Sequence, residues 1–302
     1  MSTPTADGIK PTLAELVALR ATGQRRPPAR KGRYNVAGPA HSNLRGRGME
    51  YAESREYVAG DDVRHIDWRL TARSGRTHSK LFQAERERLT LVVADTSPAL
   101  YFGTRVRFKS VQAARAAAVA VWAAVRDGDR VAILRGSHQE APVPPASGAR
   151  GALRVLDALV RWYSQPPVDD AGLGIALDHA ARLLRPGSRL IVLADPRSIA
   201  ALPEARWPAL ATHHEVVVLL LTDALESQPP KAALPFMVGG HRLELDLSNA
   251  AQRQRWQQEF KQPVEHALQQ LPRRGVRVYS LQGDAPSESW LPLLGRAQSR
   301  VA

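Results

Sequence analysis

The chain has 302 residues, of which 44% are hydrophobic and 24% are charged, and it contains no cysteine. These values are typical of a globular protein with one large or two ordinary domains, and the lack of cysteine excludes disulfides, thiol catalysis and cysteine-ligated metal centres. The net charge of +13, from 42 basic and 29 acidic side chains, has two interpretations: a bias of composition towards arginine, or an anionic partner.

The first segment of the chain is basic, because residues 1–48 carry nine Lys or Arg against two Asp or Glu. Apolar side chains recur at helical spacing in residues 12–20, and Thr12 with Glu15 forms a capping-box pattern at the start of that helix. A stretch rich in Pro, Gly and Arg follows and predicts a linker. We therefore interpret residues 1–45 as a basic helix and linker. The segment lacks a signal-peptide layout, and the chain has no apolar run long enough to span a membrane, so we expect a cytoplasmic protein.

In residues 46–88, acids, arginines and aromatics alternate over a short span. Three acids, Asp61, Asp62 and Asp67, could converge as the metal cluster of a hydrolase. We favour a network of paired charges, because several arginines lie within a few residues of these acids. These arginines are Arg55, Arg64, Arg69 and Arg73. We also expect Trp68 and Tyr57 to pack against the domain that follows.

From residue 89 onward, short apolar runs alternate with helical patterns. The predicted strands are residues 89–94, 130–134, 189–194, 214–221 and 276–281, and the predicted helices are residues 110–125, 149–162, 173–184, 200–211, 249–271 and 291–294. The Pro-containing residues 140–145 predict an edge strand, and residues 241–247 an antiparallel strand. This alternation predicts an α/β domain over residues 89–285, with a mostly parallel sheet covered by helices on both faces and a tail at 286–302.

Acidic residues directly follow two of the predicted buried strands, at Asp95 and Asp195. In parallel α/β sheets, ligands bind at the carboxyl ends of the strands. The run Asp95-Thr96-Ser97 resembles the metal-binding loop of von Willebrand factor A-type domains. This resemblance implies a Rossmann-like fold and a weakly bound Mg²⁺ at Asp95, Ser97 and Asp195.

Two hydroxyl ligands of that family's metal site are missing from this chain. Ala99 replaces the second serine of the first loop, and the resemblance puts the threonine of the second loop at about Ala171. Asp169 or Asp170 could assist a metal ion here, since Mg²⁺ requires several oxygen ligands. The alternative is that Asp95 caps local backbone amides.

Residues 103–110 imitate a phosphate-binding loop, but Phe108 stands where the second glycine is needed. Lys109 is therefore expected to begin a helix on its solvent side. The chain contains neither a Gly-x-Ser-x-Gly elbow nor a His-Glu-x-x-His helix. We accordingly expect a protein that is not an enzyme.

Residues 46–73 resemble the signature of the bacterial domain-of-unknown-function 58 family. The matching residues are Gly46, Gly48, Glu50, Arg55, Tyr57, Gly60, Asp61, Asp62, Arg64, Ile66, Asp67, Trp68, Ala72 and Arg73. This resemblance implies a von Willebrand factor A-like fold and a partner, a MoxR-type AAA+ ATPase. It also implies an adaptor that assembles or activates client proteins. The alternatives are nucleic-acid or anionic-surface binding through the basic N-terminal arm and, less favoured, a metal-dependent hydrolase. Nucleic acid is disfavoured because the arm has few aromatics for stacking.

Overall fold

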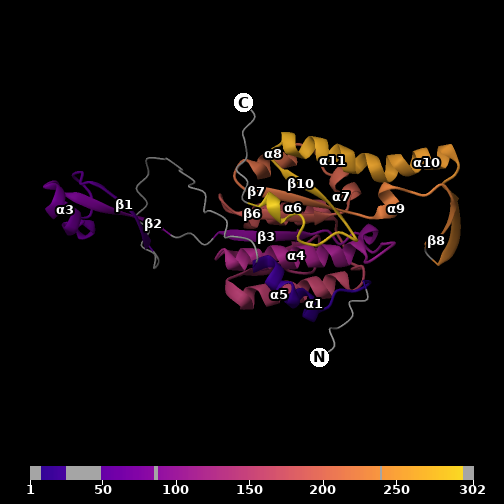
Figure 1. The fold of residues 1–302 in the computed structure, drawn as a ribbon, viewed down its shortest axis with the longest axis horizontal. Helices are drawn as coiled ribbons and strands as arrows, with labels where there is room; N and C mark the ends of the chain where they lie inside the picture. The colour runs from indigo at the N-terminus through magenta and orange to yellow at the C-terminus, as the bar shows by residue number, and fades with distance from the viewer. Residues whose placement is uncertain (1–7, 25–48, 85–87, 239, 295–302) are drawn as a thin grey trace. The chain divides into compact units, whose positions relative to one another are not determined.

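The computed structural model describes residues 8–24, 49–84, 88–238 and 240–294. The chain divides into two compact units (Figure 1). The α/β unit comprises Met1–Gly32 and Arg88–Ala302, and the signature unit comprises Arg33–Glu87. The N-terminal segment and the α/β domain, predicted as separate regions, thus share one unit. The predicted linker, with Gly46 and Gly48, lies almost wholly outside the described residues.

A six-stranded sheet forms the centre of the α/β unit. Its strands are β3 (Leu89–Ala94), β4 (Arg130–Arg135), β5 (Val143–Ala146), β6 (Arg189–Ala194), β7 (Glu215–Thr222) and β10 (Arg277–Gln282), in the order β10-β7-β6-β3-β4-β5. All neighbours pair in parallel except β4 and β5. The predicted α/β fold with a mostly parallel sheet is confirmed. The Pro-containing strand β5 lies at the edge, because proline has no amide hydrogen to donate to a second neighbour.

One face of the sheet is covered by α4 (Lys109–Arg126), with α5 (Gly148–Tyr163), α1 (Leu13–Ala18) and α2 (Arg20–Gln24) packed around it (Figure 1). α4 is buried along most of its length, because these helices cover the side that the sheet leaves open. The Trp122 indole N–H on α4 donates to the Leu16 carbonyl of α1 at 3.0 Å. The predicted N-terminal helix is thus confirmed and forms part of the hydrophobic core.

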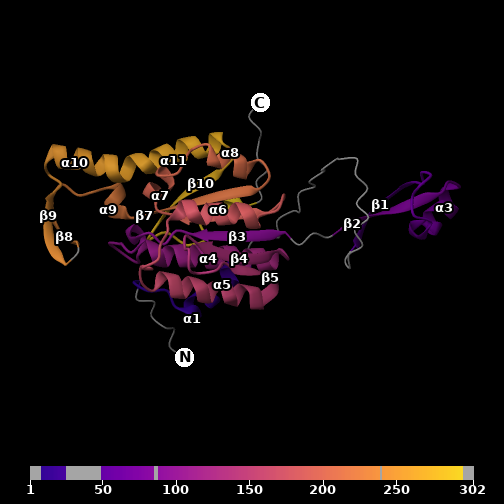
Figure 2. The ribbon, with the colours of Figure 1, turned by 180° about the vertical axis from the view of Figure 1, so that it is seen from behind.

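The opposite face carries α6 (Leu173–Leu183), α7 (Pro196–Ala200), α8 (Arg206–Ala211) and α11 (Gln262–Arg273) (Figure 2). The helix predicted at 200–211 is instead the two short helices α7 and α8. The break precedes Pro203, since a residue before proline avoids the helical conformation. Among the described residues, no helix is long and apolar enough to span a membrane.

The long helix predicted at 249–271 is interrupted. It consists of α10 (Ala250–Trp256), a π-helical turn (Gln257–Lys261) and α11. The turn ends two residues before Pro263, whose ring nitrogen cannot donate the hydrogen bond that a regular helix needs. Asn249 caps α10 by accepting from the Ala251 and Gln252 amides.

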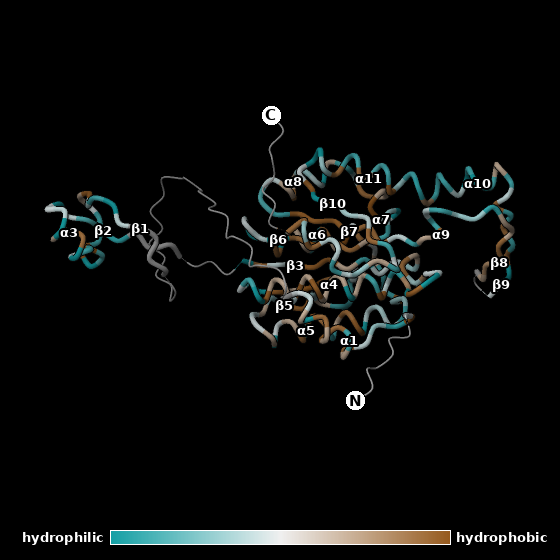
Figure 3. Tube along the Cα trace, in the orientation of Figure 1, coloured by the Kyte–Doolittle hydropathy of each residue, from teal (hydrophilic) through white to brown (hydrophobic). Residues whose placement is uncertain are grey.

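A short helix, α9 (Ala224–Ser227), and a hairpin of β8 (Ala233–Val238) and β9 (His241–Asp246) connect β7 to α10. The predicted antiparallel strand at 241–247 is confirmed, although it pairs with β8 outside the central sheet. The hairpin exposes Met237 and Leu243. Apolar residues concentrate in the central strands, whereas α10 is mostly hydrophilic (Figure 3).

The amino end of the sheet is closed by a network of arginines and acids. Glu215, at the start of β7, accepts from Arg189 Nε at 2.9 Å and from Arg277 Nη1 at 2.6 Å. Arg88 pairs with Asp129 at 2.9 Å. Arg189 and Asp129 are almost fully buried, so these ion pairs neutralise charges that water cannot reach.

The signature unit is built on the antiparallel pair β1 (Met49–Glu56) and β2 (His78–Ala84), with a 3₁₀ turn (Val63–His65) and α3 (Trp68–Ser74) between them. Asp67 begins α3 by accepting from the Leu70 amide at 3.1 Å. Gly75 ends the helix with φ +70°, a conformation that favours glycine.

Candidate functional site

Three parallel strands of the central sheet end in an acid. Asp95 follows β3, Asp195 follows β6 and Asp223 follows β7. The chain leaves β3 for α4 on one face of the sheet and leaves β6 for α7 on the other. β3 and β6 are neighbours, so the strand order reverses between them, and crevices at such points are the usual ligand sites of α/β sheets.

The Asp95 carboxylate is buried, and both of its oxygens accept hydrogen bonds from nearby donors. Its Oδ1 accepts from the Ser97 amide at 2.9 Å, and its Oδ2 accepts from the Asp195 amide at 3.0 Å and from the Ser97 hydroxyl at 3.4 Å. Burial raises the pKa of Asp95, and these hydrogen bonds, with one from Ser198, offset only part of that effect. This carboxylate holds the β3 and β6 loops together by capping their backbone amides.

Asp195 lies against two cations. Its Oδ2 accepts from Lys109 Nζ at 2.7 Å, and its Oδ1 accepts from the Arg197 amide at 3.0 Å and from Arg197 Nε at 3.1 Å. Burial alone would raise the pKa of Asp195, but the charge of Lys109, helped by Arg197, brings it below its usual range. Lys109 is 0% exposed, so the prediction that it lies on the solvent side of its helix is wrong.

Glu226 on α9 completes the surroundings of Lys109, since its Oε1 accepts from Lys109 Nζ at 2.6 Å. Burial raises the pKa of Glu226, and Lys109 lowers it only part of the way back. The two carboxylates around one ammonium therefore differ, because Asp195 has Arg197 as a second cation. Glu226 also accepts from the Asp223 amide at 2.9 Å in a capping box.

The sequence analysis missed Asp223 and Glu226. Two signals were present: Asp223 directly follows an apolar strand, as Asp95 and Asp195 do, and Asp-x-x-Glu is a capping-box pattern. Asp223 also accepts from the Thr104 amide at 3.0 Å and the Thr104 hydroxyl at 2.6 Å. It thereby anchors the loop that precedes α4.

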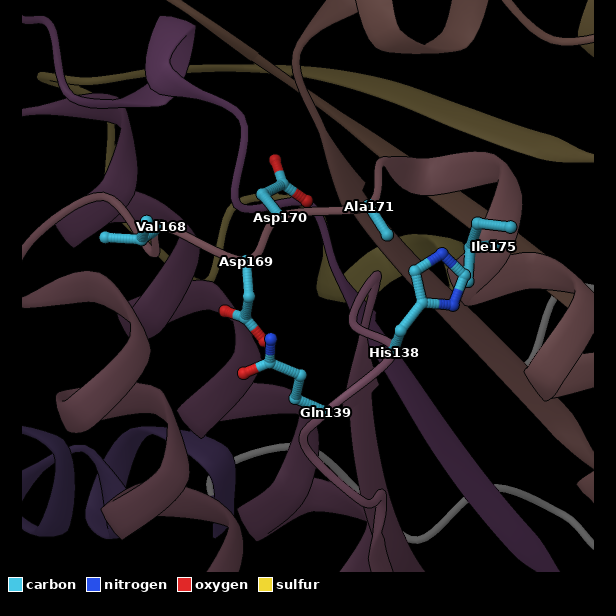
Figure 4. Close-up of a pocket in the computed structure, with 7 residues that line it drawn as sticks. All are labelled: His138, Gln139, Val168, Asp169, Asp170, Ala171 and Ile175. Atoms are coloured by element: carbon cyan, nitrogen blue, oxygen red, sulfur yellow. The ribbon is translucent and has the colours of Figure 1, made fainter.

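The loops after β4 and before α6 line an open cavity of about 410 Å³. Figure 4 shows Asp169 and Asp170 in its wall, with their carboxylates pointing in different directions. Asp169 pairs with Arg135 Nη2 at 2.6 Å and accepts from the Ser137 hydroxyl, and the pKa of Asp169 is lowered chiefly by that hydroxyl. Asp170 accepts from the Gly172 amide at 3.0 Å. Both carboxylates therefore have partners within these loops.

These residues do not fit the Mg²⁺ site that the sequence resemblance implies. The oxygens of Asp95 and Asp195 already accept from amides, a hydroxyl and two cations. Ala99 and Ala171 offer no side-chain oxygen, and Mg²⁺ requires nearly octahedral oxygen coordination. Among the described residues, no group of three His, Asp or Glu is placed to hold a metal ion. The side chains at this site therefore give no support for metal-dependent chemistry.

In the signature unit, the acids contact local donors. Asp61 Oδ1 accepts from Arg55 Nη2 at 2.7 Å and its Oδ2 from the Val58 amide at 3.0 Å. Asp62 accepts from the Arg64 amide at 3.0 Å. Asp67 Oδ2 accepts from the Ser54 hydroxyl at 3.0 Å. Asp61 and Asp62 thus stabilise the turns in which they stand, and Asp67 also joins the start of α3 to β1.

The signature arginines behave differently from one another. Arg55 pairs with Asp61, whereas the exposed side chains of Arg64, Arg69 and Arg73 have no ion pair among the described residues. Trp68 is also exposed, at 70% of its surface. Tyr57 is half-buried and its amide donates to the Thr77 carbonyl at 2.8 Å, and Gly60 has φ +109°. That Trp68 and Tyr57 pack against the α/β unit stays a prediction.

Comparison with known families identifies this signature. The sequence profile described as "Protein of unknown function DUF58" matches residues 53–266. The chain belongs to the DUF58 family. The match begins within the signature unit and continues through the α/β unit into α11, so the DUF58 region includes parts of both units.

Curated relatives of this DUF58 protein come from mycobacteria. Uncharacterized proteins of Mycobacterium bovis and Mycobacterium tuberculosis are 30% identical to it over 190 residues, which are 61% of this chain and 58% of theirs. The chain therefore matches little more than half the length of these relatives.

Two solved structures are similar at low identity. One is the conserved hypothetical protein BatB from Bacteroides thetaiotaomicron, with a TM-score of 0.43 and 16% identity over 68% of this chain and 95% of that one. The other is an aerotolerance-related membrane protein from Bacteroides fragilis, with a TM-score of 0.41 and 16% identity over 67% of this chain and 94% of that one. Both scores are low, so the interpretation of this DUF58 protein rests on its own residues.

Proposed function

We propose that this DUF58 protein is a non-enzymatic adaptor that works with a MoxR-type AAA+ ATPase to assemble or activate client proteins. The observation that carries the proposal is the exposed tryptophan of the signature unit, Trp68, next to arginines that have no ion pair within the described part of the chain. We also propose that the α/β unit is von Willebrand factor A-like. Its support is the parallel sheet with one antiparallel edge strand and the Asp95-Thr96-Ser97 loop after β3.

Exposed apolar side chains gather in one part of the signature sequence. Trp68 is 70% exposed, Val63 62% and Val58 57%. Tryptophan side chains are mostly buried in folded proteins, and tryptophan is among the residues that contribute most to binding at protein interfaces. A surface of this kind supports docking to another protein.

The charge beside Trp68 indicates what kind of surface would bind there. Arg69 and Arg73 lie four residues apart on α3, so they share one face of that helix, and Arg64 precedes it in the 3₁₀ turn. All three are exposed. Such a surface favours an acidic partner, because opposite charges steer association and like charges repel basic surfaces.

The α/β unit supports a binding role in its own way. Asp95, Asp195 and Glu226, the buried carboxylates at the carboxyl end of the sheet, are used in holding loops together. The ATPase itself is proposed from the family resemblance of the signature residues. The adaptor would bind it through the signature unit, alone or together with the carboxyl end of the sheet.

The test is co-purification with a MoxR-type ATPase from the same genome, in the nucleotide-free, ADP-bound and ATP-analogue-bound states. Trp68→Ala should weaken the complex about 30-fold, which corresponds to a loss of about 2 kcal/mol at an interface hot spot. Leu153→Ala, at an exposed apolar residue of α5, is the matched control and should bind as the wild type does. No complex in any nucleotide state, or equal binding by Trp68→Ala, would refute the proposal.

Two further measurements test two alternatives. If Trp68 packs against the α/β unit, Trp68→Ala should lower the melting temperature of that unit in the absence of any partner. If the anionic partner is a nucleic acid, binding should weaken steeply with salt, by an amount set by the number of phosphates contacted. Deleting residues 1–48 is unsuitable for this purpose, because it removes α1 and α2 from the core.

A further inference from the structure

We propose that the ammonium group of Lys109 is a built-in cation that takes the place of a divalent metal at the carboxyl end of the sheet. In this view the surface there keeps its shape without a metal ion. Removing the ammonium, while keeping the carboxylates, should create a site that binds Mn²⁺ or Mg²⁺.

The position of Lys109 carries the inference. Its Nζ lies 2.7 Å from Asp195 Oδ2 and 2.6 Å from Glu226 Oε1, and all three side chains are at most 8% exposed. Lys109 comes from α4, Asp195 from the end of β6 and Glu226 from α9. One buried cation thus joins three elements that are far apart in the sequence, as a bound metal ion would.

The charges around Lys109 make its ammonium necessary. Without it, Glu226 would be buried without a neutralising charge, and Asp195 would keep Arg197, which contacts its other oxygen, as its cation. A buried carboxylate requires a cation or hydrogen-bond donors in place of water. The ammonium group supplies up to three donors, and two of them are accounted for by these carboxylates.

The composition of the loops agrees with a cation that is supplied by a side chain of the protein and not by a bound metal ion. A divalent ion requires several oxygen ligands, whereas an ammonium is satisfied by two carboxylates and one further acceptor. The first loop has Ala99 and the second has Ala171 at the positions where the resemblance implies hydroxyl ligands. Asp95, next to Asp195, spends both its oxygens on amides and a hydroxyl. The scarcity of oxygen ligands and the presence of a buried lysine are thus consistent with each other at this site.

The test compares the wild-type protein with Lys109→Met, which keeps most of the side-chain volume and removes the charge. Melting temperature is measured in EDTA and in millimolar MnCl₂ or MgCl₂, and Mn²⁺ binding is measured by electron paramagnetic resonance. The wild type should bind no Mn²⁺ and melt at the same temperature in all three. Lys109→Met should melt lower in EDTA, recover part of the loss in MnCl₂, and bind one Mn²⁺ that Asp195→Asn abolishes.

The matched control is Lys261→Met, since this lysine is exposed and pairs with the exposed Glu265 of the adjoining helix α11. It should melt as the wild type does and bind no Mn²⁺. The inference is overturned if the wild type binds Mn²⁺ and Asp195→Asn removes that binding. It is also overturned if Lys109→Met folds but neither binds Mn²⁺ nor gains stability from it.

Should Lys109→Met fail to fold both in EDTA and in MnCl₂, the wild type decides the matter. Lysine-selective nuclear magnetic resonance should then show a charged Lys109 ammonium whose protons exchange slowly with water and whose signal is unaffected by Mn²⁺. A Lys109 signal that exchanges rapidly, or that Mn²⁺ broadens selectively, would overturn the inference.

Discussion

The N-terminal helix α1 gives the sharpest test of the fold, because it offers a buried and an exposed leucine on the same short helix. Leu16 is 0% exposed and belongs to the core that α1, α4 and α5 share. Leu13 is 41% exposed. Replacing each with alanine removes the same atoms from two different environments.

The expected losses follow from that difference. Leu16→Ala should reduce the free energy of unfolding by about 3 kcal/mol, because it loses burial and leaves a cavity beside α4. Leu13→Ala should cost about 0.5 kcal/mol, as for a surface substitution. For a unit of this size, a loss of about 3 kcal/mol lowers the melting temperature by about 6–12 °C.

The measurement is thermal unfolding followed by tryptophan fluorescence, since the indole of Trp122 donates to the Leu16 carbonyl and reports on this contact. Circular dichroism at the same temperatures checks that the helices of the α/β unit melt together. Equal small effects of Leu16→Ala and Leu13→Ala would refute the placement of α1 in the core. The basic segment would then be a free arm, as an anionic-docking role requires.

Two further predictions concern the two ends of the sheet. Burial raises the pKa of Glu215, but the charges of Arg189 and Arg277 lower it by a larger amount. The pKa of Glu215 is therefore below the usual 4.5. Its stabilising effect is therefore complete above pH 4.5 and is lost as the pH falls through the lowered folded-state value. Glu215→Gln should cost about 3 kcal/mol in urea unfolding at pH 7 and much less at low pH; a loss independent of pH would contradict this. At the other end, a Cβ on Gly136 would lie 2.1 Å from the Gly172 carbonyl oxygen, so Gly136→Ala should cost about 2 kcal/mol or more. Unfolding at an unchanged urea concentration would contradict that close approach.

Local pattern was sufficient for much of the fold. The apolar runs of β3, β6 and β7 predicted buried parallel strands because a strand covered on both faces cannot alternate polar and apolar residues. The same runs located Asp95 and Asp195, since the residue after a buried strand necessarily lies at the edge of the sheet. The signature motif identified the DUF58 family, because a long spaced motif is specific even when its chemistry is unknown.

Pairing between distant residues could not be predicted in this way. Lys109 was expected in solvent because it opens a helix after a polar loop, yet its partners are 86 and 117 residues further along the chain. Conversely, Arg64, Arg69 and Arg73 are close to acids in sequence but have no ion pair among the described residues. Asp62 and Asp67 instead accept from amides of their own turns, which are nearer and lose less conformational freedom on binding.

The sequence by itself determined which segments are strands and helices, where the acids stand and to which family the chain belongs, because these depend on short-range periodicity and motif spacing. Tertiary structure decided that α1 covers α4 and that Lys109, Asp195 and Glu226 meet. Burial sets the energy of a charge, and burial depends on which segments pack together. The burial of Lys109 and the exposure of Trp68 therefore follow only from the folded chain.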